Sequence, residues 1–165
     1  IVNDIWALRQ PGAAAVVAQH PRCGVCLMHM HRDPQTMQLA PMTGDVVMQV
    51  LSFLEQRAGY LRGLGVNSSR IMLDPGIGFG KTVEQNFTLL ARQHALLASG
   101  YPILAGWSRK SSLGAVSGLE APHRMVPSVA AAVLAVDRGA RVVRVHDVRD
   151  TVAALSVWSA MQAGV

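Results

Sequence analysis

Short apolar runs alternate along the whole chain with longer segments in which apolar residues recur at a helical period. The segment 45–61 is the clearest of these, because Val46, Val50 and Leu54 repeat with a period near 3.6. Five strands are predicted, at 1–5, 25–30, 70–74, 102–106 and 141–146. Helices are predicted at 12–19, 45–61, 83–98, 128–137 and 150–161. The pattern therefore predicts one domain built from repeated β-α units.

Repeated β-α units predict an α/β fold with a parallel sheet, either an open doubly wound sheet or part of a (β/α)₈ barrel. Polar side chains lie at or just after the carboxyl ends of all five predicted strands, at Asn3 and Asp4, His29 and His31, Asp74, 108–110, and Arg144 with His146. In a barrel all strands open onto one face, whereas in an open sheet only strands beside the switch point contribute. Five contributing strands favour the barrel.

The stretch 73–82 is the strongest candidate for an active-site loop, because an apolar strand leads through Asp74 into a glycine-rich turn. Glycines at 76, 78 and 80 allow the backbone to approach a ligand. The spacing fits neither a Walker A loop nor a dinucleotide fingerprint, so nucleotide binding is not favoured. Lys81 is interpreted as a solvated residue of the loop or of the helix start. Asp74 itself has two interpretations, a turn and helix cap or a functional carboxylate.

Half of the residues are hydrophobic and 15% are charged, so the chain is apolar enough to fold around a sizeable core. The net charge of +5 favours anionic ligands, but the Lys and Arg residues are scattered and aromatic residues are scarce, so no nucleic-acid partner is expected. No apolar run reaches the roughly 20 residues needed to span a bilayer, so no membrane partner is expected and the default location is cytoplasmic.

Two further features of the chain bear on its organisation. Cys23 and Cys26 form a C-x-x-C pair, for which redox chemistry and zinc binding are weaker interpretations than ordinary packing. The first residue is Ile1 rather than methionine, and it begins a strand-like run. We therefore expect the natural amino terminus to lie outside this chain.

Five motifs in the same order resemble those of dihydropteroate synthase, a pterin-binding barrel enzyme family of folate biosynthesis. These motifs, with Pro41 between the second and third, are Asn3-Asp4-Ile5, Cys26-Leu27-Met28-His29-Met30, Leu73-Asp74-Pro75-Gly76-Ile77-Gly78-Phe79-Gly80-Lys81, Gly106-Trp107-Ser108-Arg109-Lys110-Ser111 and Arg144-Val145-His146-Asp147-Val148. The resemblance implies that residues 1–165 are a single pterin-binding domain, incomplete at its amino end, with roughly the last five β-α units of a (β/α)₈ barrel. It also implies a homodimer when full length, and Mg²⁺ whose ligand lies in the missing part, so no metal ligand is expected here.

The family joins (7,8-dihydropterin-6-yl)methyl diphosphate to 4-aminobenzoate, giving 7,8-dihydropteroate and diphosphate. The resemblance assigns pterin binding to Asn3, Ile5, Met28, Asp74, Gly106 and Lys110, the aminobenzoate pocket to Phe79, Ser108 and Arg109, and diphosphate binding to Arg144 and His146. It makes Lys110, Arg144 and His146 catalytic, since donors fixed where charge develops on the leaving diphosphate are the chief requirement. Trp107 and Pro127 depart from the family pattern, where smaller residues and a glycine are expected.

Two alternatives remain open from the sequence. A pterin-binding methyltetrahydrofolate methyltransferase domain would match Asp74 but has little use for an anion site at Arg144 and His146. An inactive fragment of the synthase is the other alternative, because five strands cannot close an eight-stranded barrel and their edges would be exposed. This chain alone is therefore expected to be inactive.

Overall fold

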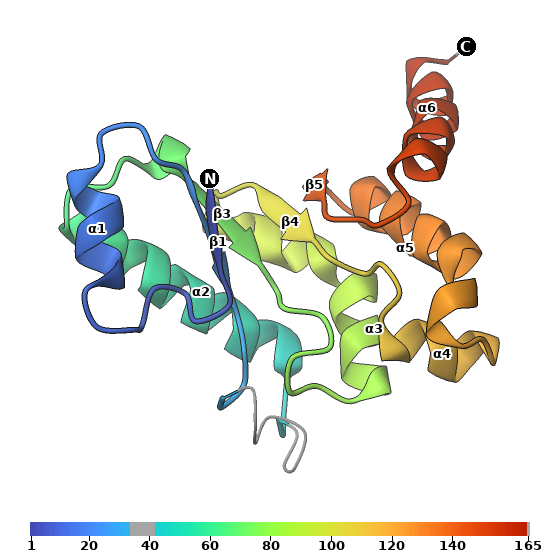
Figure 1. Cartoon of the computed structure of the whole chain (residues 1–165), viewed down its shortest axis with the longest axis horizontal. Helices are drawn as coiled ribbons and strands as arrows, with labels where there is room; N and C mark the ends of the chain where they lie inside the picture. The colour runs from blue at the N-terminus through green and yellow to red at the C-terminus, as the bar shows by residue number, and fades with distance from the viewer. Residues whose placement is uncertain (34–41, 165) are drawn as a thin grey trace.

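The computed structural model describes residues 1–33 and 42–164, so Pro41 lies outside the described residues. Five parallel strands form one sheet in chain order (Figure 1): β1 (Val2–Asp4), β2 (Val25–Met28), β3 (Ile71–Asp74), β4 (Ile103–Ala105) and β5 (Ala140–Val143). The α/β prediction with five parallel β-α units is confirmed. The strands are shorter than predicted, most clearly β5, which ends three residues before His146.

Helices connect successive strands, as right-handed crossovers in a parallel sheet require. They are α1 (Ala13–Gln19), α2 (Val46–Gly63), α3 (Val83–Ala91), α4 (Ser111–Ser117), α5 (Met125–Asp137) and α6 (Val148–Ala163). Three 3₁₀ segments, at Ser68–Arg70, Gln93–Ser99 and Ala121–His123, complete the connections. None of the described helices is long and apolar enough to cross a membrane.

Two helix predictions were wrong in detail, and one helix was missed. The helix predicted at 83–98 ends at Ala91 and continues as the 3₁₀ segment Gln93–Ser99. Helix α4 was not predicted at all. Helix α5 begins at Met125 rather than near residue 128, so Pro127 falls in its first turn, where a missing N–H costs no intrahelical hydrogen bond.

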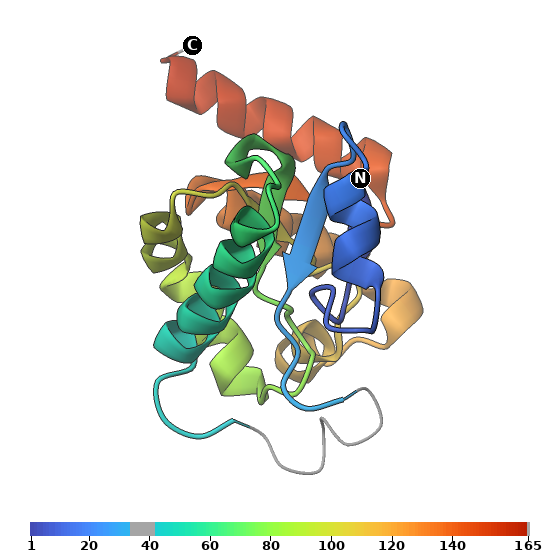
Figure 2. The same cartoon turned by 90° about the vertical axis from the view of Figure 1, so that its left-hand side faces the viewer.

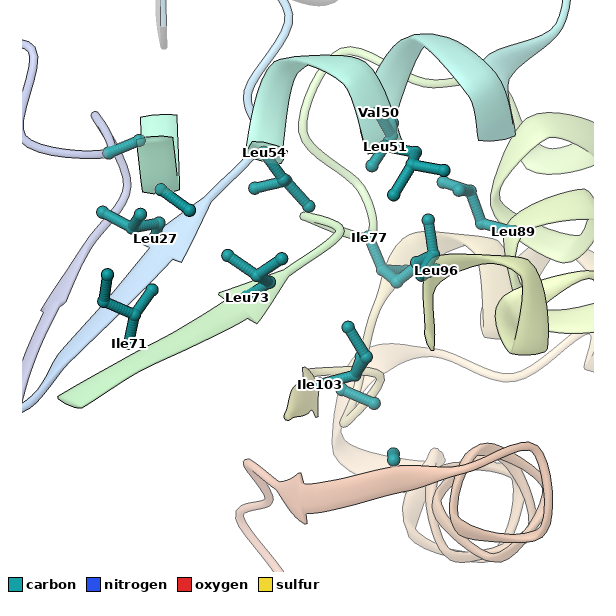
Figure 3. Packing of buried hydrophobic residues seen from close by; sticks show 14 of the residues in the cluster. Leu27, Val50, Leu51, Leu54, Ile71, Leu73, Ile77, Leu89, Leu96 and Ile103 are labelled. Atoms are coloured by element: carbon teal, nitrogen blue, oxygen red, sulfur yellow. The ribbon is translucent and has the colours of Figure 1, made fainter. Parts of the chain in front are cut away.

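The main core lies between one face of the sheet and the helices that cover it (Figure 3). Leu27, Leu73 and Ile103 point to this face, and Leu54 of α2 packs over Leu73. The 18-residue helix α2 buries seven side chains, because its apolar residues repeat on one side. We call this side of the sheet the helix-covered face.

The opposite face of the sheet, which we call the inner face, carries a small apolar cluster of Cys26, Met72 and Leu104. Side chains alternate along a strand, so Met28 and Asp74 lie on the same face as Cys26 and Met72, one step nearer the carboxyl ends. Burial raises the pKa of Cys26 to about 12, which keeps its thiol protonated. Cys26 therefore packs as a small apolar residue, in line with the packing interpretation.

The two ends of the sheet are less covered than its centre. Within the described residues, β1 and β5 each have one strand neighbour. Helix α6 packs against α5 at the edge of the molecule (Figure 2), and Thr151 is its one buried residue among those described. The prediction of exposed sheet edges is therefore confirmed for the described part of the chain.

Candidate active site

The glycine-rich turn begins at the carboxyl end of β3 and depends on backbone conformations that favour glycine. Gly76, Gly78 and Gly80 have φ values of 69°, 80° and 72°. At Gly76 a Cβ would also lie 1.8 Å from the carbonyl oxygen of His29, so no larger residue fits. The turn is thereby packed directly onto the segment that follows β2.

Asp74 is fully buried at the start of this turn. Its Oδ1 accepts a hydrogen bond from the Gly76 N–H at 2.8 Å, and its Oδ2 accepts one from Arg144 Nη1 at 3.0 Å. Burial raises the pKa of Asp74, and the charge of Arg144 opposes that rise. Because each carboxylate oxygen can accept more than one bond, Asp74 keeps acceptor capacity for a ligand.

A pocket of about 350 Å³ opens at the carboxyl ends of the strands. It is lined by Asn3, Ile5, Phe79, Gly106, Ser108, Lys110, Arg144, Val145 and His146. Asn3 belongs to β1 itself, and the other residues come from the segments that follow β1, β3, β4 and β5. Most of the predicted site residues are thus brought together, and Asp74 reaches the group through Arg144. Met28 is buried beside Asp74 in the strand register and does not line this pocket.

Lys110 lies over the ring of Phe79, with its Nζ 4.3 Å from the ring centroid. Burial and the neighbouring charge of Arg144 lower the pKa of Lys110, while Asp74 acts in the opposite sense. The side chain of Lys110 also lies close to Gly78, where a Cβ would meet its Cδ at 3.3 Å. The conformation of the glycine-rich turn therefore affects where Lys110 lies.

Arg144 and His146 both line the pocket, although they lie beyond the end of β5. The prediction that they share a face of the strand itself was wrong, because the strand stops at Val143. Arg144 crosses directly over Gly106, where a Cβ would lie 2.5 Å from its Nη2. His146 Nδ1 lies 2.8 Å from Ser108 Oγ, and its backbone N–H donates to the same oxygen at 3.1 Å. Ser108 thus fixes His146.

Arg109 is the predicted site residue that points elsewhere. Its guanidinium forms an ion pair with Asp147, at 2.8 Å between Nη2 and Oδ1, and Arg109 is not among the residues lining the pocket. Arg109 has a positive φ of 60°, and its backbone N–H donates to Ser128 Oγ at 2.9 Å. These contacts shape the loop after β4, while its role towards aminobenzoate stays a prediction.

Sequence reasoning missed Lys81 and left His29 unassigned, yet both are buried next to the site. The interpretation of Lys81 as a solvated residue was wrong: its exposed fraction is 4%, and its Nζ lies 2.9 Å from His29 Nδ1. The sequence offered one signal for each residue: His29 lies at the end of an apolar strand, and Lys81 directly follows a glycine. Nothing in the sequence shows that the two side chains contact each other.

Trp107, which is expected to depart from the family pattern, has a bulky side chain that the core accommodates. Its ring is buried and packs against Phe87, with ring centroids 5.3 Å apart. Among the buried side-chain nitrogen and oxygen atoms of the described residues, Trp107 Nε1 is the one without a hydrogen-bond partner. The bulky indole therefore belongs to the core behind the loop and not to the pocket lining.

The described residues contain no group of three or more His, Cys, Asp or Glu side chains that could hold a metal ion. The cationic groups at the pocket are Lys110 and Arg144, and the one fully buried carboxylate beside them is Asp74. The site is thus suited to an anion and to a ligand edge that offers hydrogen-bond donors.

The sequence pattern of the family described as pterin binding enzyme matches residues 1–146. The chain belongs to the pterin-binding enzyme family. This assignment agrees with the geometry, in which a buried strand-end carboxylate pairs with an arginine of a pocket formed at the carboxyl ends of parallel strands.

Relatives within the family include several dihydropteroate synthases. The curated dihydropteroate synthase of Neisseria meningitidis serogroup C is 46% identical over 163 residues, which cover 98% of this chain and 58% of that protein. The structure of the Burkholderia cenocepacia synthase complexed with 7,8-dihydropteroate superimposes with a TM-score of 0.90 at 53% identity, covering 98% of this chain and 60% of that one. The Xanthomonas albilineans synthase with 4-aminobenzoic acid gives 0.90 at 48% identity, with 98% and 57% covered. The resemblance is confirmed, and the chain spans under two thirds of each relative.

Proposed function

We propose that this chain forms part of the active site of a dihydropteroate synthase. The observation that carries the proposal is the buried Asp74, which pairs with Arg144, a residue that lines the same pocket as Lys110. Identities of 46% to 53% to dihydropteroate synthases over nearly the whole chain support the same reaction. In this proposal residues 1–165 belong to a single pterin-binding domain that is incomplete at its amino end.

Asp74 is proposed to bind the pterin. A pterin edge offers adjacent N–H donors, and a carboxylate can accept two of them in a charge-assisted pair. Burial makes that pair stronger than in water but also costs desolvation, which Arg144 and the Gly76 N–H partly offset. Asn3 would bind another edge of the ring, Ile5 and Met28 would contact its flat faces, and Gly106 would admit it closely.

Arg144, His146 and Lys110 are proposed to serve the bond-breaking step. The amine nitrogen of aminobenzoate forms a bond to the pterin methylene carbon, and the carbon–oxygen bond to diphosphate breaks. The electron pair leaves with diphosphate, and the amine loses a proton. Donors fixed at the leaving group stabilise the developing charge. The ion pair between Arg144 and Asp74 links the two ends of the reacting molecule, because the guanidinium that would bind the diphosphate also contacts the carboxylate that would bind the pterin.

Phe79 and Ser108 are proposed to shape the aminobenzoate pocket, and Arg109 to support it from the loop behind. The Phe79 ring already packs against the Lys110 ammonium, so a flat aromatic acid entering here would find both a ring and a cation. The X. albilineans synthase binds 4-aminobenzoic acid on the same fold.

Mg²⁺ remains part of the proposal as the counter-ion of the diphosphate, although the described residues offer no metal-binding group and no step is assigned to it. A homodimer and a cytoplasmic location are likewise proposed on the grounds of the family alone.

The test is diphosphate release and dihydropteroate formation by the longest natural polypeptide that contains this chain, with magnesium present. We expect both products with the unmodified protein and neither with Asp74→Ala. A folded protein that binds dihydropterin but ignores its diphosphate would instead favour the methyltetrahydrofolate methyltransferase alternative. A protein that binds neither would favour the inactive alternative.

A further inference from the structure

We propose that Lys81 is a positioning residue: it ties the glycine-rich turn to the segment after β2 and thereby holds Phe79 and Lys110 in place for aminobenzoate. The inference rests on the proposed function, because it names the substrate whose binding depends on this tie. Lys81 does not line the pocket, so it acts through the turn.

In its protonated form Lys81 donates all three of its ammonium hydrogens to the two segments. Its Nζ donates to the carbonyl oxygens of Gly76 at 2.9 Å and Phe79 at 3.2 Å, and to His29 Nδ1 at 2.9 Å. The first two acceptors lie within the turn, and the third lies beyond β2. One buried cation therefore joins segments that are 52 residues apart in the sequence.

His29 is suited to be the acceptor of this tie. It is 5% exposed, and its ring packs edge-on against Phe53 with centroids 5.0 Å apart. Burial, and then the charge of Lys81, lower the pKa of His29 to about 2. The imidazole is thus neutral, and the bond from Lys81 requires Nδ1 as acceptor and the proton on Nε2.

The tie is continuous with the pocket wall. The Phe79 carbonyl that Lys81 holds also accepts from the His31 N–H at 3.4 Å, so two bonds fix one peptide group. The ring of the same Phe79 supports Lys110. A change in the turn therefore displaces both the aromatic wall and the ammonium beside it.

Asp74, in contrast, receives its hydrogen bonds from other residues, while Lys81 acts on it through its charge. The backbone oxygen of Asp74 accepts from the His29 N–H at 2.9 Å, and its carboxylate is bound by Gly76 N–H and Arg144. Loss of Lys81 should therefore affect aminobenzoate more than pterin. Burial lowers the pKa of Lys81 to about 7, with Asp74 acting against burial and Lys110 adding to it.

The deciding experiment compares Lys81→Met with Arg62→Met in the longest natural polypeptide that contains this chain. Arg62 is exposed on α2, so the control makes the same replacement of a cation away from the turn. In Lys81→Met we expect the KM for 4-aminobenzoate to rise about tenfold or more, because small displacements of a positioned wall are costly. The KM for the pterin diphosphate should stay within about threefold, and Arg62→Met should change neither.

Equal changes in the two KM values, or no change in a folded Lys81→Met protein, would overturn the proposal. If Lys81→Met does not fold, His29→Phe decides, since it keeps an aromatic ring against Phe53 and removes one acceptor. In His29→Phe the KM for 4-aminobenzoate should again rise more than the KM for the pterin diphosphate, but by a smaller factor than in Lys81→Met. Unchanged KM values would overturn the proposal.

Hydrogen exchange separates this inference from the proposed reaction. If the unmodified protein forms no dihydropteroate, the proposed function fails, but the tie still predicts faster amide exchange at Phe79 and His31 in Lys81→Met. Their N–H groups donate to Gly76 and Phe79, the residues whose carbonyls Lys81 also holds. Unchanged exchange at both amides would overturn the tie itself.

Discussion

Leu73 and Asp74 are neighbours on β3, both fully buried, but they face opposite sides of the sheet. Leu73 points to the helix-covered face, where it packs with Leu54 and the rest of the main core (Figure 3). Asp74 points to the inner face and meets Arg144. Equal burial therefore affects stability in opposite ways. Burying the Leu73 side chain stabilises the fold, whereas burying the Asp74 carboxylate costs desolvation free energy.

The comparison shows how the two faces divide stability and function. The helix-covered face is closed by leucine, isoleucine and valine, and its interactions hold the sheet together. The inner face carries a raised-pKa carboxylate beside two cations, an arrangement that stabilises the fold less than apolar packing would. Substitutions on the two faces should therefore change different measurable quantities.

The largest effect is expected from Leu73→Ala. Removing a fully buried leucine side chain leaves a cavity beneath α2 and should cost about 2–5 kcal/mol of unfolding free energy. Chemical denaturation measures this loss, and pterin affinity of the remaining folded protein should be nearly unchanged. Leu64→Ala is the control, because Leu64 is 43% exposed and its truncation should cost far less. A similar cost at both positions would mean that Leu73 is not part of a tightly packed core.

Asp74→Asn should produce the reverse result. It removes the charged acceptor, so pterin binding should weaken about a hundredfold, equivalent to about 2.7 kcal/mol. Unfolding free energy at neutral pH should stay the same or rise, since the buried charge is lost. Titration calorimetry with a dihydropterin and a denaturant melt measure the two quantities. A strongly destabilised variant would show that the Arg144 pair outweighs the cost of burial.

The unfolding free energy of Asp74→Asn, measured as a function of pH, provides a second test. The folded pKa of Asp74 lies above its ordinary value of 3.8, so the folded protein holds this proton more tightly than the unfolded chain does. The stability that this group contributes is complete below pH 3.8 and is lost as the pH rises through the folded pKa. Asp74→Asn should remove that loss. The difference in unfolding free energy between the variant and the unmodified protein should therefore grow as the pH rises from 3.8 through the folded pKa of Asp74.

Arg57→Gln tests a residue that connects the two faces, and its effect should be smaller. From α2, Arg57 donates to the carbonyl oxygens of Ala7 at 3.0 Å and Leu8 at 3.2 Å, and both residues have positive φ. Loss of these bonds should cost about 1–2 kcal/mol. Pterin affinity should also fall about threefold, because the same loop carries Ile5 into the pocket.

The control for that variant is Arg62→Gln, at an exposed position of the same helix. It should leave both the denaturant midpoint and pterin affinity unchanged. If Arg57→Gln lowers stability without any change in affinity, the loop conformation does not reach the pocket, and the two faces are more independent than the structure indicates.

The order of elements could be predicted from sequence because strands and helices here differ in length and period. The segment around Val50 and Leu54 repeats at a helical period over many residues, and this is a strong signal. Helix α4 could not be found in the same way, since Ser111–Ser117 is short and contains Gly114. The segment is too short and too poor in apolar residues to show a helical repeat.

The candidate site could be predicted in part, because strand-end residues of a parallel sheet meet at one edge. That rule brings Asn3, Lys110 and His146 to one pocket. It does not say which side chains pair with one another. The bond between Arg144 and Asp74 spans 70 residues, and the turning of Arg109 to Asp147 depends on a loop with positive φ. Such pairings follow from tertiary packing alone.

Thr82→Ala should give the smallest change in stability. It extends the comparison to a second pair of neighbouring residues, Lys81 and Thr82, of which one is proposed to hold the turn and the other caps a helix. Thr82 Oγ1 accepts from the Gln85 N–H at 3.2 Å, and Gln85 Oε1 accepts from the Thr82 N–H at 2.9 Å, a capping box that starts α3. Its loss should cost about 1 kcal/mol and lower Tm by a few degrees, as a thermal melt measures. Aminobenzoate KM should be unchanged, because the cap stabilises a helix that packs on the helix-covered face. If Thr82→Ala instead raised that KM as much as Lys81→Met, the turn would be held by the helix start and not by the buried ammonium.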